Sequence, residues 1–246
     1  MASFRVVPVL DMKHSVAVHG VKGQRDKYAP VSCNWCSDGD VLQLVNGYQS
    51  LLGLDDLYVA DLDAITEGTP SIDVYLKIKE AVRGRIMIDA GLTSLQAFHD
   101  LESHDFAEII LGTESVPSLA VFRDIITANR NDTIISFDVK NGQVLSPIKK
   151  LASAGIDGAF HAIEALNPGA IIFLDLTNVG AKIGVNPVAK RLVDASSIPV
   201  FLGGGIKSAN DLKDAKDEGF CGVLVATALQ EGLIDRAGIE AIMQSM

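Results

Sequence analysis

Short apolar runs rich in β-branched residues recur along this chain, and amphipathic segments separate them. The runs cover residues 4–10, 56–59, 85–88, 108–111, 133–137, 170–174, 199–202 and 222–225. Continuous apolar runs of this length are typical of parallel strands buried on both faces, and segments such as 71–82 and 209–218 have the spacing of crossover helices. Eight such units in 246 residues predict an α/β fold, the (β/α)8 or TIM barrel, with a doubly wound sheet as the alternative.

No linker, low-complexity tract or change of composition divides the chain, so we expect residues 1–246 to form one domain. Hydrophobic residues make up 48% of the sequence, which is enough for a substantial core. No apolar run reaches the roughly 18 residues of a membrane-spanning helix, and residues 1–8 lack the features of a secretory signal. We therefore expect a cytoplasmic protein with no membrane partner.

The charge and the cysteine content of the chain exclude further classes of protein. The net charge of −10 repels a polyphosphate backbone, so we expect no nucleic-acid partner. Cys33 and Cys36 have the spacing of half a zinc ribbon but lack a second pair, and we interpret them as reduced thiols in a loop. Metal-binding, serine-hydrolase and phosphate-loop NTPase motifs are absent from the sequence, and we expect no bound metal or cofactor.

The two halves of the chain share one pattern. At an offset of 114, residues 89–94 align with residues 203–208, and the first strands align at a longer offset. The matched positions are Asp11-Met-Lys13 with Asp138-Val-Lys140, Asp61 with Asp175, Asp89-Ala-Gly91 with Gly203-Gly-Gly205, and Gly112-Thr113 with Ala226-Thr227. The sequence therefore predicts two half-barrels, roughly 1–129 and 130–246, whose shared residues all follow strands, where barrel active sites lie.

The glycine-rich turns are candidate phosphate sites. Gly203, Gly204 and Gly205 follow the seventh predicted strand, and Ala226 and Thr227 follow the eighth. Backbone N–H groups can approach a phosphate closely at such turns, so we expect one phosphate there. The matching first-half residues are Gly91, Gly112 and Thr113. Asp89 stands where the first glycine of the triplet would be, and a carboxylate there repels phosphate, so we expect a neutral or cationic substrate end at that half.

Asp11 and Asp138 end equivalent strands, so a two-fold barrel places them across its mouth. Two such carboxylates can divide acid and base roles, and we expect Asp11 as base and Asp138 as acid, although the spacing leaves the order open. The alternative is that each pairs with its own lysine, Lys13 or Lys140. We count Lys13 and Asp175 among the candidate binding residues, and expect Asp61 to bond loop amides instead.

The segment 13–40 is long for a loop in a compact domain. It carries His14, His19, Lys22, Arg25, Lys27, Tyr28 and Trp35. These cations could clamp an anionic substrate when the loop closes, or the loop could simply be solvated.

The motifs together resemble the histidine-biosynthesis barrels, the HisA/HisF family. The similarity extends over nearly the whole chain, through residues 7–13, 59–63, 110–113, 137–140, 203–208 and 223–228. The resemblance implies that Asp11 and Asp138 are the catalytic acid/base pair. It also implies that the turns around Gly91, Gly112, Gly205 and Ala226-Thr227 hold two phosphates of a long substrate.

Departures from the family pattern point to another substrate. The family motif after the sixth strand has a threonine and a later aspartate, which this chain lacks in residues 174–181, and Thr93 replaces an arginine. We therefore expect a divergent HisA-like enzyme that isomerises a smaller, singly phosphorylated sugar or aminosugar, by an aldose–ketose or Amadori-type reaction. A lyase or synthase and a non-catalytic phosphometabolite-binding subunit are the alternatives. The sequence leaves the metabolite, the pathway and the oligomeric state open.

Overall fold

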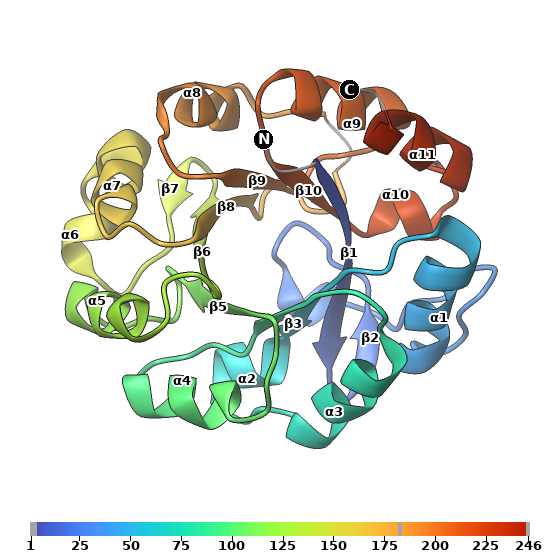
Figure 1. The fold of residues 1–246 in the computed structure, drawn as a ribbon, viewed down its shortest axis with the longest axis horizontal. Helices are drawn as coiled ribbons and strands as arrows, with labels where there is room; N and C mark the ends of the chain where they lie inside the picture. Colours follow the sequence, from blue (N-terminus) through green and yellow to red (C-terminus); the bar gives the residue numbers. More distant parts are fainter. Residues whose placement is uncertain (1–3, 182–183, 245–246) are drawn as a thin grey trace.

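The strands close into a ring. The computed structural model describes residues 4–181 and 184–244. Its parallel strands are β1 (Arg5–Lys13), β3 (Leu57–Asp61), β4 (Ile86–Asp89), β5 (Glu108–Gly112), β6 (Thr133–Lys140), β8 (Ala170–Asp175), β9 (Val200–Gly203) and β10 (Gly222–Val225). Each strand pairs with the next, and β10 pairs with β1, with Gly222 opposite Arg5. This closed ring (Figure 1) confirms the (β/α)8 barrel and excludes the open, doubly wound sheet.

Helices surround the ring (Figure 1). They are α1 (Val41–Leu52), α2 (Leu62–Glu67), α3 (Ile72–Ala81), α4 (Leu95–Glu102), α5 (Leu119–Ala128), α6 (Lys149–Ala152), α7 (Gly155–Glu164), α8 (Pro187–Ala195), α9 (Ala209–Asp217), α10 (Thr227–Gln230) and α11 (Arg236–Gln244), with a 3-10 turn η1 (Arg25–Lys27). Ser94 and Ser208 cap α4 and α9 by accepting backbone N–H groups, so the aligned serines of the two halves have the same role. Within the described ranges, no helix is long and apolar enough to cross a bilayer.

The strands are apolar on both faces because each face has its own core. One cluster fills the barrel interior, and a larger one lies between the strands and the helices. Val7, Met87, Ile110, Ile172 and Leu224 belong to the interior cluster. Successive strand residues point to opposite faces, so an unbroken apolar run supplies both layers.

A short hairpin follows the D-x-K motif in each half. Lys13 pairs with Val16 of β2 (Val16–Val18), and Lys140 pairs with Gln143 of β7 (Gln143–Val144). Both central residues of each turn, 14–15 and 141–142, have positive φ, as a type I′ turn requires. The Asn-Gly dipeptide at 141–142 favours this turn.

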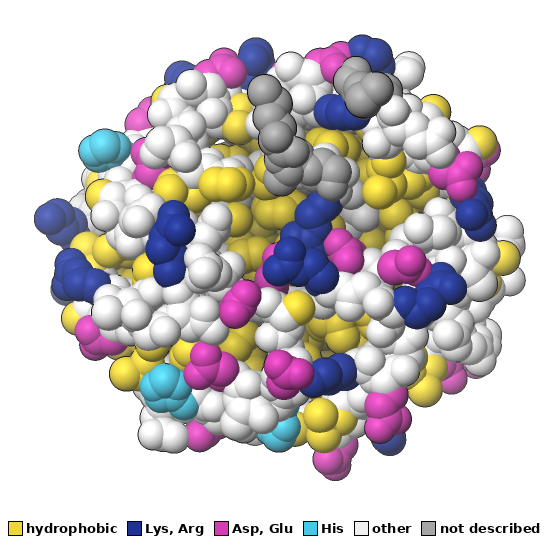
Figure 2. All heavy atoms as spheres, in the orientation of Figure 1, with side chains coloured by type: hydrophobic (Ala, Val, Ile, Leu, Met, Phe, Trp, Pro, Cys, Tyr) yellow, Lys and Arg dark blue, Asp and Glu magenta, His cyan; other side chains and the backbone are white. Residues whose placement is uncertain are grey.

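Figure 1 looks onto the amino-terminal ends of the strands, because β1 begins near the viewer and recedes. Charged side chains gather at the centre of this face (Figure 2). The guanidinium of Arg5 bonds both Glu108 carboxylate oxygens at 3.0 and 3.1 Å, and its Nε bonds Asp56. The Arg5 guanidinium also lies 5.4 Å from the Phe201 ring centre. These contacts close the amino-terminal end of the barrel, and the candidate site lies at the opposite end.

Candidate active site

A cavity of about 90 Å³ lies at the carboxyl ends of the strands. Its walls are largely apolar, and include Leu174, Leu176, Ile206 and Leu224. Asp11, Asp89 and Glu114 line it from the first half, and the loops after β9 and β10 line it from the second. The cavity therefore joins a carboxylate-rich end to a glycine-rich end.

Asp11 lies on β1 and faces this cavity. Burial raises the pKa of its carboxyl to about 7, the charge on Arg25 opposes this shift, and the charge on Asp89 adds to it. A carboxyl with a pKa near 7 exchanges protons readily at physiological pH, which suits a general base.

Asp138 lies on β6 and is only 2% exposed. Its carboxylate accepts bonds from the Ser136 hydroxyl at 2.6 Å, the Thr113 hydroxyl at 3.3 Å and the Glu114 backbone N–H at 3.2 Å. Burial and the charge on Glu114 raise the pKa of Asp138 well above its ordinary value. Asp11 lines the cavity. Asp138 is not among the described lining residues, and its carboxylate lies against the backbone of Glu114.

Asp89 ends β4 and lines the same cavity as Asp11, level with it but two strands away, with Ala60 of β3 between them. Its carboxylate accepts a bond from the Tyr58 hydroxyl at 3.1 Å and one from the Gly91 backbone N–H at 3.2 Å. Burial raises the pKa of Asp89 to about 6, and the charge on Glu114 contributes to that rise. The first glycine position of the family triplet is thus occupied by a second buried carboxyl group that faces the substrate space.

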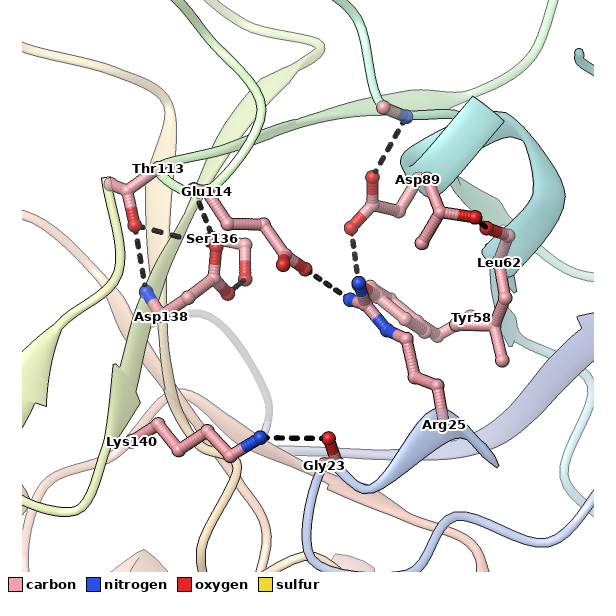
Figure 3. A network of polar contacts seen from close by, with 12 residues as sticks. Gly23, Arg25, Tyr58, Leu62, Asp89, Thr113, Glu114, Ser136, Asp138 and Lys140 are labelled. Atoms are coloured by element: carbon pink, nitrogen blue, oxygen red, sulfur yellow. Dashed lines mark hydrogen bonds and ion pairs between the residues drawn. The ribbon is translucent and has the colours of Figure 1, made fainter. Parts of the chain in front are cut away.

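An ion pair crosses the cavity mouth between two loops. Arg25, on η1, bonds the Glu114 carboxylate at 2.5 Å (Figure 3). Figure 3 shows the Glu114 side chain extending away from Asp138 and toward Arg25. Arg25 is one of the candidate clamping cations of the sequence. Glu114 is not among the candidates, although its position directly after Gly112-Thr113 is a signal that could have identified it.

The loop 14–40 folds over the barrel mouth as a lid. Lys140 Nζ donates to the Gly23 carbonyl at 2.8 Å (Figure 3), and the Lys22 backbone N–H donates to the Val179 carbonyl at 3.0 Å. A Cβ atom added to Gly180 would lie 2.7 Å from the Gly20 carbonyl oxygen, so this glycine permits the close approach of the two loops. The long loop is therefore an ordered cover. Of its lysines and arginines, only Arg25 is among the described residues that line the cavity.

The turns after β9 and β10, which the sequence predicts to bind phosphate, both contribute residues to the cavity wall. Gly204, Gly205, Ala226 and Thr227 all line it. Gly204 has φ of +89°, a left-handed conformation that glycine adopts easily, and Gly205 has φ of +92°. Gly203 instead ends β9 and packs against Leu174, since an added Cβ would lie 2.7 Å from that side chain. Gly203 thus supports the turn from the strand side.

The matching residues of the first half have other neighbours. A Cβ on Gly91 would lie 2.5 Å from Ile65 Cα, so Gly91 packs against α2. A Cβ on Gly112 would lie 3.4 Å from Asp138 Oδ2, and the Thr113 hydroxyl also accepts the Asp138 backbone N–H at 2.9 Å. Gly112 and Thr113 therefore contact Asp138, and the described first-half wall of the cavity presents Asp89 and Glu114 instead of these three residues.

The second symmetric pair of aspartates bonds loop groups. Asp61 is fully buried and accepts bonds from the backbone N–H groups of residues 63, 64 and 71 and from the Tyr75 hydroxyl, as expected for a structural residue. Asp175 accepts bonds from the side-chain amides of Asn178 and Asn186 at 2.7 and 2.6 Å. Lys13 Nζ lies 3.5 Å from the Arg25 carbonyl oxygen. In this arrangement Asp175 and Lys13 hold loops that border the site.

The cysteines and acidic groups show no metal centre in the described residues. Cys33, Cys36 and Cys221 are free thiols. In the lid, Cys33 and Cys36 pair through their backbones as an isolated antiparallel β-bridge. Residues 4–181 and 184–244 contain no group of three or more His, Cys, Asp or Glu side chains placed to hold a metal ion.

The fold and the cavity define a (β/α)8 barrel whose candidate site has acidic groups at one end and a glycine turn at the other. Residues 5–235 match the family model described as "Histidine biosynthesis protein". The chain belongs to this family. The resemblance noted in the sequence is thereby confirmed, and it covers nearly the whole barrel.

Relatives within the family have different descriptions. An uncharacterized protein of Methanocaldococcus jannaschii is 30% identical over 94% of this chain and 95% of its own length. A protein of Natronomonas pharaonis is 29% identical over 94% of each chain, and one of Methanosarcina barkeri is 27% identical over 98% and 99%. Both of the latter are named 1-(5-phosphoribosyl)-5-((5-phosphoribosylamino)methylideneamino) imidazole-4-carboxamide isomerase.

Proposed function

We propose that this chain is an isomerase of the phosphoribosyl isomerase type, which acts on a sugar or aminosugar with a single phosphate. The observation that carries the proposal is the cavity, because it connects Asp11 to the glycine turn at Gly204 and Gly205. The names of the relatives support the isomerase class. The phosphate site after the last two strands is the position at which barrels of this kind commonly bind phosphate.

The two aspartates have properties that suit an aldose–ketose or Amadori-type reaction. Burial favours the protonated form of Asp138 by raising its pKa, which suits a group that supplies a proton to the sugar ring oxygen as the ring opens. Asp11, with a pKa of about 7, can then remove the proton from C2 and return one to C1. Asp138 recovers a proton from the C1 hydroxyl or amine as the ring opens. Overall, one hydrogen moves from C2 to C1 and one proton moves from the C2 oxygen to the C1 oxygen or nitrogen, so the atoms balance.

Asp138 reaches the substrate only if its neighbour moves. It is 2% exposed and lies beneath Glu114, whose side chain is held by Arg25. Separation of the Arg25–Glu114 pair would open a path from Asp138 to the cavity. Substrate binding and acid catalysis are therefore coupled through the lid in this proposal.

The dimensions and charge of the site favour a small substrate. With the lid in this position the cavity measures about 90 Å³, well below the roughly 300 to 1,000 Å³ of ordinary ligand pockets. Asp89 and Glu114 occupy the first-half wall where a second phosphate would otherwise bind. A single phosphate at the glycine turn is compatible with both observations.

The proposal is tested with a panel of sugar and aminosugar monophosphates in D2O. Thermal stabilisation of the protein reports binding, and proton NMR reports isomerisation together with deuterium incorporation at C2. We expect one substrate class to do both. Asp11→Asn and Asp138→Asn should lower turnover by about 10² to 10⁴ while stabilisation of the protein by inorganic phosphate is retained. Binding without turnover or exchange by the wild type would instead favour a binding subunit.

A matched pair of variants tests the phosphate site. Glycine replacements are unsuitable, because a Cβ at Gly204 would lie 2.8 Å from the Asp175 carbonyl oxygen. Thr227 lines the cavity and is only partly buried. Thr227→Glu places a negative charge beside the expected phosphate and should abolish stabilisation by phosphate esters, whereas Thr227→Gln, of similar size but neutral, should retain most of it. Equal loss in both variants would contradict an anion site at this position.

A further inference from the structure

The first-half end of the cavity contains more negative than positive charge. Three carboxylates, on Asp11, Asp89 and Glu114, line it, and Arg25 is the only Lys or Arg side chain among its described lining residues. Arg25 is already bound to Glu114 at 2.5 Å. Asp11 and Asp89 thus share the cavity wall, and among the described residues neither forms an ion pair of its own, although the charge on Arg25 acts on both.

The hydrogen bonds of Asp89 do not balance its charge. Its partners are the neutral Tyr58 hydroxyl and the Gly91 backbone N–H. Burial disfavours the charged form of both carboxyl groups, and each has a raised pKa, about 7 for Asp11 and about 6 for Asp89. A positive charge placed between them would stabilise both ionised forms.

The remaining walls favour an ammonium group over a metal ion. Tyr58 and Tyr28 line the same cavity, and aromatic rings attract organic cations. A divalent cation requires several oxygen ligands, and the described residues contain no group of three or more side chains placed to hold one. An ammonium group has three N–H donors, which two carboxylates can accept, and the apolar walls can contact its carbon chain.

We propose that the substrate of this site carries an amine at the end opposite its phosphate, and that Asp11 and Asp89 bind the ammonium form of that amine. This inference rests on the proposed function and narrows its substrate class to phosphorylated amines such as aminosugar phosphates. The ammonium group then lies beside Asp11, so the carbon next to the nitrogen is the one from which Asp11 takes its proton. Asp89 determines specificity at the first-half end of the cavity, where it forms part of a cation site in place of a second phosphate-binding site.

The inference is tested with three matched series of synthetic probes. These are ω-aminoalkyl phosphates, n-alkyl phosphates and α,ω-alkanediol bisphosphates, each with three to six carbons, with Kd measured by calorimetry on the full-length protein. At the best length we expect the aminoalkyl phosphate to bind about ten- to a hundredfold more tightly than the alkyl phosphate, the usual effect of a charge-assisted hydrogen bond. The bisphosphate should bind most weakly.

Asp89→Asn and Asp105→Asn provide the matched variants. Asn at position 89 can still accept the Tyr58 bond, so we expect the fold to be retained and the preference for the amine to fall by about tenfold. The side chain of Asp105 is 99% exposed, and its variant should preserve the wild-type preference. Circular dichroism and thermal unfolding without ligand identify any variant that has not folded.

Inorganic phosphate separates failure of this inference from failure of the proposed function. If phosphate and alkyl phosphates bind in a manner lost in Thr227→Glu, but the amine adds no affinity, the cation site is wrong and the phosphate site stands. If the amine preference persists in Asp89→Asn, Asp89 is not the residue responsible and the inference is overturned. If none of the probes, including phosphate, binds, both proposals are wrong.

Discussion

Replacement of Asp11 by Asn should stabilise the protein relative to the wild type, and this difference in stability should grow as the pH rises. The Asp11 carboxyl has a pKa of about 7 in the folded protein, against an ordinary value of 3.8. The unfolded chain therefore loses this proton more readily than the folded one. Ionisation above pH 3.8 then favours the unfolded state, and folding free energy is lost progressively until the pH passes about 7. Asn has no charge and avoids this loss.

The size of the effect follows from the two pKa values. A difference of about 3 pKa units corresponds to at most about 4 kcal/mol above pH 7, because each unit is worth about 1.4 kcal/mol. Roughly half of this loss is already present at pH 5.5, so the advantage of the variant should grow by about 2 kcal/mol between pH 5.5 and pH 8. For a chain of this size that is an increase of about 4 to 8 °C in the Tm difference.

Thermal unfolding of the wild type and Asp11→Asn at several pH values between 5.5 and 8 measures this growth. Asp105→Asn serves as the control, because it makes the same substitution at a side chain that is 99% exposed and lies outside the site. A constant difference between Asp11→Asn and wild type would show that Asp11 is not held in an unfavourable environment. A difference that shrinks as the pH rises would reverse the sign of the argument.

Two further substitutions test how the site is held in place. Thr113→Val removes the hydroxyl that accepts the Asp138 backbone N–H, and should cost about 1 to 3 kcal/mol, or a Tm decrease of about 2 to 12 °C, with Thr113→Ser as the conservative control. Asp61→Asn should lower Tm by a similar amount, because four donors converge on this carboxylate, and leave phosphate affinity at the wild-type value. A Tm within a degree of wild type in either variant would contradict these roles.

The barrel could be predicted from the sequence because its signal is repeated. Eight apolar runs mark eight strands, and the observed strand ends differ from the predicted ones by a few residues at most. The aligned motifs also locate the strand ends correctly, since Asp11, Asp89 and Gly204 all reach one cavity. Local spacing therefore suffices where a side chain is positioned by its own strand.

The relative placement of groups on different loops could not be predicted in this way. The separation of Asp138 from the cavity depends on Glu114, and the position of Glu114 depends on Arg25, which is 89 residues away. No local pattern encodes that contact. The roles of Thr113 and Asp175 were likewise unpredictable, because their partners belong to the tertiary arrangement of the loops.

The lid is attached to both halves of the chain. Arg25 bonds Glu114 in the first half, while Gly23 and Lys22 bond Lys140 and Val179 in the second. A single half could supply strands, an aspartate and a glycine turn, but it has no second anchor for the cover. A half on its own would need a second copy to anchor the cover, whereas the present chain carries both anchors itself.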